Sequence, residues 1–501
     1  MSLTKTTHRT AYISGVLLLA VLFSMGWGIL VSRSALLGLI FLFGAAYTVL
    51  VFFRPFYATV AFVFALPFGP FLNIPFTRNG YLLSLAVVQI AFVVWATKAL
   101  LARDDKFVAL SLINPVCLLM VAFLITMALS LVNTNDVIVS LRQIKRFTYY
   151  VIIYIFVVGT VENKQRFKIV VLALVGSYFF VALFGLVEAI SGKLIYEFFG
   201  NRSLFRAAVP EMALIVNPAK LNGPMGNAEF HSFRMITFLI FMLCPFFLVR
   251  SRLKKVFISL LLLLALINII GTSYRGAVLG LTVAVATFFF GVQLRHKWIK
   301  LAAGLVLTLL LGFSVYVMFP HLSVERVVKL QGKEAETVHF RKRNALIGLK
   351  MALDHPIIGN GPDGFMLKYK SYSNELPQAH YRAVKAHNTY VQVLCEYGAL
   401  GLLVFGLVIF LTLRNVSRLL KKTKGSDHFF VVALYATLTA HVAMMIGGNM
   451  LLDDNWWLLV AMAAAAERIY SAGNVNRKQV WKESNITRRV PRKSPLTETP
   501  V

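Results

Sequence analysis

Two short polar sequences interrupt the apolar runs of this chain and hold side chains that could do chemistry. Gly271-Thr-Ser-Tyr-Arg275-Gly-Ala places an arginine among small residues at the junction of two apolar runs, and His387-Asn388 begins another run in which Gln392 also falls. A guanidinium can hold a phosphate through two hydrogen bonds, and a neutral histidine can accept a proton from a hydroxyl group. The alternatives are an arginine that snorkels to lipid headgroups and a structural histidine. Polar clusters in membrane segments nevertheless favour function.

Other sites with familiar spacing are excluded by the sequence. Residues 359–364 match G-x-G-x-x-G, but they contain a proline and follow no buried strand, so they predict a tight turn and no dinucleotide site. The three cysteines form no C-x-x-C pair, which argues against a disulfide framework or a zinc site. No P-loop and no H-E-x-x-H sequence occurs. We therefore expect no cofactor and no metal.

The composition predicts a membrane protein. Hydrophobic residues make up 58% of the 501 residues, and the mean hydropathy is +0.73, whereas soluble chains average nearer 45–50% apolar. A membrane-spanning helix needs about 20 mainly apolar residues. The chain offers about fourteen such runs, of which three are short, so we expect an all-α fold with about 12–14 transmembrane helices. The runs lie near 11–32, 35–53, 56–72, 81–101, 112–132, 147–161, 166–190, 234–249, 256–271, 276–294, 301–319, 388–413, 429–447 and 455–470.

The distribution of charge predicts the orientation. Lysine and arginine number 51 against 21 acidic residues, giving a formal net charge of +30. Basic residues gather near 250–255, 295–300 and 414–424 and in the tail after Arg468, and the positive-inside rule makes all four cytoplasmic. Both termini then also lie inside, and the active site would face the periplasm. Most of the positive charge is thereby explained without nucleic acid as a partner.

Two long polar segments fall on the outer side and are themselves basic. They cover residues 191–233 and 320–386, and the second is predicted to be helical over 340–354. Their charge is either a solvated face or an attraction for anionic substrates and lipid headgroups. The predicted divisions are N-terminal transmembrane helices (1–190), a first outer loop (191–233), central helices (234–319), a large outer loop (320–386), C-terminal helices (387–470) and a basic cytoplasmic tail (471–501).

The polar motifs resemble those of a known family. His387-Asn388, nine residues, Gly398, two residues and Gly401 resemble the signature of the O-antigen ligase family. Ser-Tyr-Arg275-Gly-Ala resembles its arginine motif, and Asp354-His-Pro-Ile-Ile-Gly-Asn-Gly-Pro resembles the turn in its large loop. Asn222-Gly-Pro-Met-Gly-Asn227-Ala-Glu-Phe resembles a further segment of that family. The resemblance covers roughly residues 200–450.

The resemblance implies a GT-C-like membrane glycosyltransferase that needs neither nucleotide sugar nor metal. Its donor would be a glycan linked to undecaprenyl diphosphate in the cytoplasmic (inner) membrane, and its surroundings would be membrane lipids. A ligase would hand the glycan to lipid A–core in lipopolysaccharide biosynthesis. A polymerase would hand it to another repeat unit of O-antigen, capsule or exopolysaccharide, and the sequence leaves both open.

The resemblance also implies roles for individual residues. Arg275 would stabilise the departing diphosphate. His387 would act as the base or would hydrogen-bond the phosphate, and Asn388 would help bind the substrate. The family has an arginine on the first outer loop, where this chain has Lys220, so Arg206, Arg202 or Arg234 could supply the missing guanidinium.

Two functions of other classes compete with the transferase. A transporter for lipid-linked saccharides would favour internal repeats and broken helices at the membrane midplane. The sequence shows no repeat, and the candidate residues lie at the predicted outer surface and not at the midplane. A passive assembly scaffold would make no demand on His387.

Overall fold

The computed structural model describes Leu42 and residues 46–68, 114–193, 220–292, 333–373 and 385–487. Within these ranges every regular element is a helix, and six helices are long and apolar enough to cross a membrane. The predicted all-α, polytopic membrane fold is therefore confirmed. The predicted total of about 12–14 spans stays a prediction, because the runs at 11–32, 81–101 and 301–319 lie outside the described residues.

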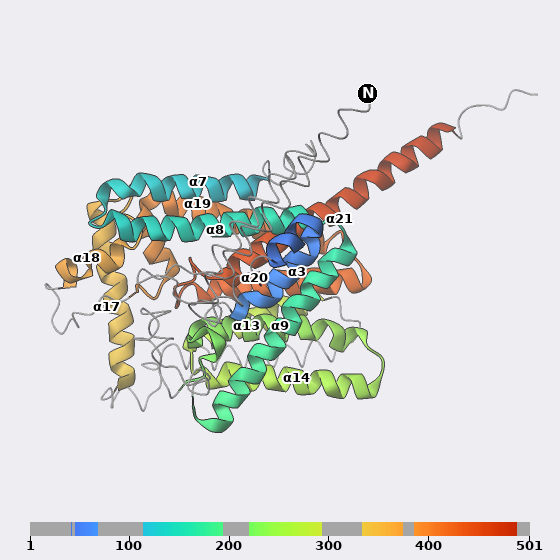
Figure 1. The fold of residues 1–501 in the computed structure, drawn as a ribbon, viewed down its shortest axis with the longest axis horizontal. Coiled ribbons are helices and arrows are strands. Elements are labelled where there is room, and N and C mark those ends of the chain that lie inside the picture. The colour runs from blue at the N-terminus through green and yellow to red at the C-terminus, as the bar shows by residue number, and fades with distance from the viewer. Residues whose placement is uncertain are drawn as a thin grey trace, which may run out of the picture.

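The helices keep the chain order in which they are labelled in Figure 1. They are α3 (Pro55–Ala65), α7 (Pro115–Ser130), α8 (Val137–Thr160), α9 (Lys164–Ser191), α13 (Ala228–Leu248), α14 (Arg252–Gly271), α15 (Arg275–Gly291), α17 (Lys333–Asp354), α18 (Gly364–Ser373), α19 (Thr389–Leu420), α20 (Gly425–Met444) and α21 (Asp454–Thr487). A short 3-10 helix, η3 (Gly223–Met225), precedes α13.

Most predicted spans coincide with a described helix, and the largest differences in their boundaries are at the start of α8 and the end of α21. The span predicted over 147–161 belongs to α8, which begins at Val137, so Arg142, Lys145 and Arg146, between two predicted spans, lie on this helix. Asp136 explains the earlier start, because its side chain accepts a hydrogen bond from the N–H of Val139 (3.1 Å) and caps the helix. The last helix continues from the predicted end near 470 to Thr487.

The helices pack into a bundle with a cross-piece at one end. α19 packs against α7, α20 and α21, while α20 also packs against α13 and α15. α17 and α18 belong to the predicted large outer loop, and the helix expected over 340–354 is found as α17. Figure 1 shows α17 running across the long axes of α7 and α8 at one end of the bundle. α17 packs against α19, so this end gathers residues that are far apart in the sequence.

A break in α19 provides the hydrogen bonds that hold α17 and the turn after it against the bundle. Gly398 has φ 66° and ψ −168° inside α19, a conformation that is essentially restricted to glycine. The N–H groups of Ala399 and Leu400 donate to the carbonyl oxygens of Pro356 (2.7 Å) and Ile357 (3.1 Å).

The carbonyl groups just before the break also find hydrogen-bond donors in the turn that follows α17. The carbonyl oxygens of Cys395 and Glu396 accept hydrogen bonds from the N–H groups of Asn360 and Gly361, each at 2.9 Å. In an unbroken helix these two carbonyls would have accepted from residues 399 and 400. Four bonds to the turn thus replace the two helical bonds that join these four residues.

Replacing Gly398 with alanine should destabilise the protein strongly. A Cβ atom there would lie 2.3 Å from the carbonyl carbon and oxygen of Ile357, in a backbone conformation that alanine disfavours. We expect a loss of at least about 2–3 kcal/mol, visible as a lower unfolding midpoint of the purified protein in detergent.

Gly406→Ala is the matched control, because this glycine is also in α19 but nothing lies within 4 Å of the added Cβ. Its effect should stay within about 0.5 kcal/mol of zero. Equal unfolding midpoints for the two variants would contradict the role assigned to the break.

Candidate functional site

The segment before α13 holds Lys220 beside the arginine motif. The N–H of Leu221 donates to the carbonyl oxygen of Gly271 at the end of α14 (3.0 Å). The backbone N–H groups of the next two residues both donate to the buried carboxylate of Glu188 at the end of α9 (2.9 Å each). These hydrogen bonds hold the Asn-Gly-Pro motif against α9 and α14, and they place Lys220 next to the turn between α14 and α15.

Tyr274 and Arg275 begin α15 after a tight turn. Ser273 has a φ of 47°, and Tyr274 is the N-cap residue of the helix. The Tyr274 ring is buried, and the guanidinium of Arg341 from α17 lies over it, 5.9 Å from its centroid. The α17 helix thereby brings a second guanidinium to the arginine motif.

His387 lies immediately before α19 with a φ of 53°. Its N–H donates to Asn449 Oδ1 (3.1 Å), and its ring faces Phe340 of α17 with 6.4 Å between centroids. The Nδ1 atom is buried and has no hydrogen-bond partner among the described residues. Burial, together with the positive charges of Arg341 and Lys385, lowers the pKa of His387 to about 4. The imidazole is therefore neutral at neutral pH and can accept a proton or a hydrogen bond.

Electrostatic coupling shows that these basic residues form one group. Burial and the nearby charges of Arg341 and Arg275 lower the pKa of Lys220. Lys220, Arg275, Arg341, Lys385 and His387, named here the basic cluster, come from four separate segments of the chain. In the part of the chain that the structure describes, no carboxylate lies within 4.0 Å of the charged nitrogens of Lys220, Arg341 or Lys385.

The loop between α20 and α21 ties three helix N-termini to this cluster. The N–H of Asn449 donates to Glu229 in the first turn of α13 (2.6 Å), while its side chain accepts from His387 at the start of α19. A Cβ on Gly448 would lie 2.0 Å from Glu229 Oε1 and 2.7 Å from the hydroxyl oxygen of Tyr274 at the start of α15.

The convergence of these helix starts adds to the positive potential. The N-terminus of a helix carries a partial positive charge. Among the described residues, the carboxyl group of Glu229 interacts electrostatically with Arg341 and Lys385. The arrangement suits an anion with several charges, such as a diphosphate.

The predicted site residues do not all meet. Lys220, Arg275 and His387 come together, whereas Arg206 and Arg202 lie outside the described residues. The Asn388 side chain caps α19 by accepting from the N–H groups of Tyr390 (3.0 Å) and Val391 (3.1 Å).

Arg234 has a different environment from the basic cluster. It is 1% exposed inside α13 and donates to the Phe230 carbonyl (2.8 Å) and to Asp453 (3.4 Å). This buried pairing favours a structural role, and its predicted role in substrate binding stays a prediction.

Sequence reasoning did not select Arg341, Lys385, Tyr274 or Glu229. Arg341 opens an Arg-Lys-Arg run in the helix that was predicted, which is a visible signal. The run does not reveal which of its members faces the site, because that depends on how α17 crosses the bundle.

Comparison with known proteins agrees with the motif reading. Residues 260–406 match the family model for O-antigen ligase. The predicted family resemblance is confirmed. The match to O-antigen ligase contains Arg275, Arg341, Lys385 and His387, while Lys220 precedes it. No curated protein matches the chain. Residues 260–406 are thus similar to O-antigen ligase, a similarity that supports a function of the ligase or polymerase type in general, and the apolar helices indicate a multi-pass membrane protein.

The basic cluster should bind inorganic pyrophosphate through Arg341. Arg341→Ala removes one charge-assisted contact, and we expect binding about tenfold weaker by calorimetry of the purified protein at low salt. Lys342→Ala removes an equal charge from an exposed neighbour on the same helix and should change affinity less than about twofold. Equal losses in the two variants would show that only net charge matters.

Proposed function

We propose that this protein transfers a glycan from undecaprenyl diphosphate to a hydroxyl group of an acceptor sugar at the outer face of the cytoplasmic membrane, without a metal ion. The acceptor is lipid A–core for a ligase or another repeat unit for a polymerase. The observation that carries the proposal is the convergence of the basic cluster with a neutral, buried histidine that has an unpaired ring nitrogen.

The basic cluster would stabilise the leaving group. When the glycosidic bond to the lipid diphosphate breaks, negative charge gathers on the phosphate oxygen that departs. Arg275 at the first position of α15, Arg341 above Tyr274 and Lys220 supply fixed positive charge from three directions. A diphosphate is already a good leaving group, so no strong general acid is needed.

His387 would accept the proton of the acceptor hydroxyl. The hydroxyl oxygen forms the new bond to the anomeric carbon, the bond from that carbon to the phosphate oxygen breaks, and the proton passes to the imidazole. In the free protein, Arg341 and Lys385 disfavour the imidazolium ion. A bound diphosphate offsets their charge, so the proton affinity of His387 would rise when the donor is in place.

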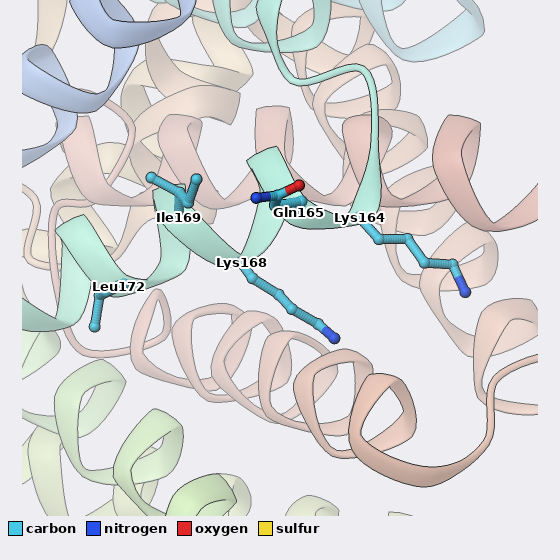
Figure 2. Close-up of a pocket in the computed structure, with 5 residues that line it drawn as sticks. All are labelled: Lys164, Gln165, Lys168, Ile169 and Leu172. Carbon is cyan, nitrogen blue, oxygen red and sulfur yellow. The ribbon is translucent and has the colours of Figure 1, made fainter.

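The distribution of basic residues along the helices supports the proposal that the site faces away from the cytoplasm. α13 begins at the site and ends beside Arg250, and α19 begins at the site and carries Arg418 in its last turn. α9 runs the opposite way: its first residues include Lys164 and Lys168, which line the pocket in Figure 2 and pair with Asp427 (2.8 and 2.9 Å). Glu188, which holds the Lys220 segment, lies roughly 36 Å further along the helix. The positive-inside rule then places the basic ends in the cytoplasm and the site outside.

Replacing His387 with alanine should abolish transfer while leaving the protein inserted. Loss of a general base costs roughly 10²–10⁴-fold in rate, measured with purified protein, undecaprenyl diphosphate-linked glycan and acceptor in the absence of an ion gradient. His355→Ala, in the turn before α18, is the matched control and should keep activity. Arg275→Ala should also lose activity, and wild-type product from both His387→Ala and Arg275→Ala would exclude the proposal.

The pH dependence of kcat/KM should report the pKa of His387 in the protein without bound substrate. Because the pKa of His387 is lowered to about 4, activity should be present above this pH and fall as the pH drops through it. Arg341→Ala removes a positive charge that opposes protonation, so the pKa should rise and the acid limb should move to higher pH. A limb that stays in place in Arg341→Ala, or moves to lower pH, would argue against His387 as the base.

A further inference from the structure

A second group of polar side chains, two of them carboxyl groups and two of them amides, lies next to the basic cluster. It consists of Gln143 on α8, Asp363 before α18, and Gln392 and Glu396 one turn apart on α19. The Gln143 amide donates to Asp363, and the Gln392 Nε2 atom lies 3.3 Å from each carboxylate oxygen of Glu396. These four residues are named here the amide–carboxylate group.

The group contains buried acceptors that lack donors. Glu396 is 2% exposed. The side-chain oxygens of Gln143 and Gln392 are buried, and neither receives a hydrogen bond from the described residues. Buried polar atoms are rarely left unpaired in folded proteins, so two such amide oxygens in one group indicate that a bound molecule supplies the donors.

The break in α19 fixes the group relative to His387. The Gly361 N–H donates to the Glu396 carbonyl (2.9 Å), which brings the turn that contains Asp363 to this part of α19. Lys385 acts electrostatically on both Glu396 and His387. The amide–carboxylate group therefore borders the basic cluster on the side of His387.

The chemistry of the group selects neutral, hydroxyl-rich molecules. None of these four side chains carries a positive charge that could hold a phosphate. Carboxylates and amide oxygens accept hydrogen bonds, amide nitrogens donate them, and a sugar hydroxyl does both. We propose that Gln143, Asp363, Gln392 and Glu396 form a subsite that binds the hydroxyl groups of a neutral sugar, and that this sugar is the acceptor. The proposal rests on the proposed function, because it places the acceptor beside His387.

Sugar binding can be measured directly. Methyl glycosides of glucose, galactose and N-acetylglucosamine would be screened by saturation-transfer NMR against the purified protein in nanodiscs. We expect at least one glycoside to bind the wild type and to bind about tenfold more weakly to Gln392→Leu and to Gln143→Leu, since each variant removes hydrogen bonds at nearly constant volume. Gln165→Leu is the control, because Gln165 is exposed in the first turn of α9, far from the group, and its replacement should leave glycoside binding unchanged.

Inorganic pyrophosphate separates this proposal from the proposed function. The two glutamine variants should bind pyrophosphate as the wild type does, which also shows that they are folded, whereas Arg341→Ala should bind pyrophosphate about tenfold more weakly and keep the glycoside. No glycoside binding to the wild type, or equal glycoside binding to the glutamine variants, would overturn the subsite while leaving the diphosphate site standing. Failure of the wild type to bind pyrophosphate would instead count against the proposed function.

A competition experiment distinguishes the acceptor from the sugar of the donor. Farnesyl diphosphate and farnesyl diphosphate-linked N-acetylglucosamine would each be added to the protein with the bound glycoside. If the subsite holds the acceptor, the glycoside stays bound with both lipids. Displacement by the sugar-linked lipid alone would assign the subsite to the donor and overturn the acceptor assignment.

Discussion

The site depends on the exchange of backbone hydrogen bonds at Gly398. Inside a membrane protein each backbone polar group needs a partner, so a helix can break only where another segment supplies the missing bonds. The turn at residues 356–361 supplies all four. This requirement fixes the turn against α19, and α17, which leads into the turn, is held across the end of the bundle. Arg341 on α17 and His387 before α19 consequently belong to one site although 46 positions separate them in the numbering.

A second constraint acts through the small residues between α20 and α21. Gly447 and Gly448 leave room for Arg341, Tyr274 and Glu229, and any larger residue at 448 would collide with the last two. Glu229 uses its carboxylate to hold the Asn449 N–H, so it orders the loop while it offsets part of the surrounding positive charge. Among the described residues, no carboxylate lies within 4.0 Å of the charged nitrogens of Lys220, Arg341 or Lys385. The helix bundle holds these positive charges close together, and a bound anion would reduce the repulsion between them.

Local pattern predicted the helices and the principal motifs, and the limits of the prediction have physical causes. Apolar runs and helical spacing gave the all-α fold and the helix over 340–354, while the types and positions of Arg275, His387 and Lys220 indicated chemistry. Arg234 was a candidate because it lies near the predicted outer end of a span. Helical rise places it roughly 10 Å inside α13, where it faces Asp453. Arg341 is one of three consecutive basic residues. The direction in which each of these side chains points depends on tertiary packing, so the local sequence did not distinguish Arg341 from its neighbours.

The basic cluster and the neighbouring amide–carboxylate group give the proposed reaction a direction. A glycosyl group that leaves one oxygen for another needs its leaving group and its incoming hydroxyl on different sides of the anomeric carbon. In the proposed site, Lys220, Arg275 and Arg341 surround the departing diphosphate, whereas the amide and carboxyl groups of the adjoining region hydrogen-bond the hydroxyl groups of the acceptor. His387 lies at the boundary, coupled to Arg341 on one side and, through Lys385, to Glu396 on the other. A base at this boundary can reach the incoming hydroxyl, and because its proton affinity responds to the charge of the bound diphosphate, it would act only when both substrates are present.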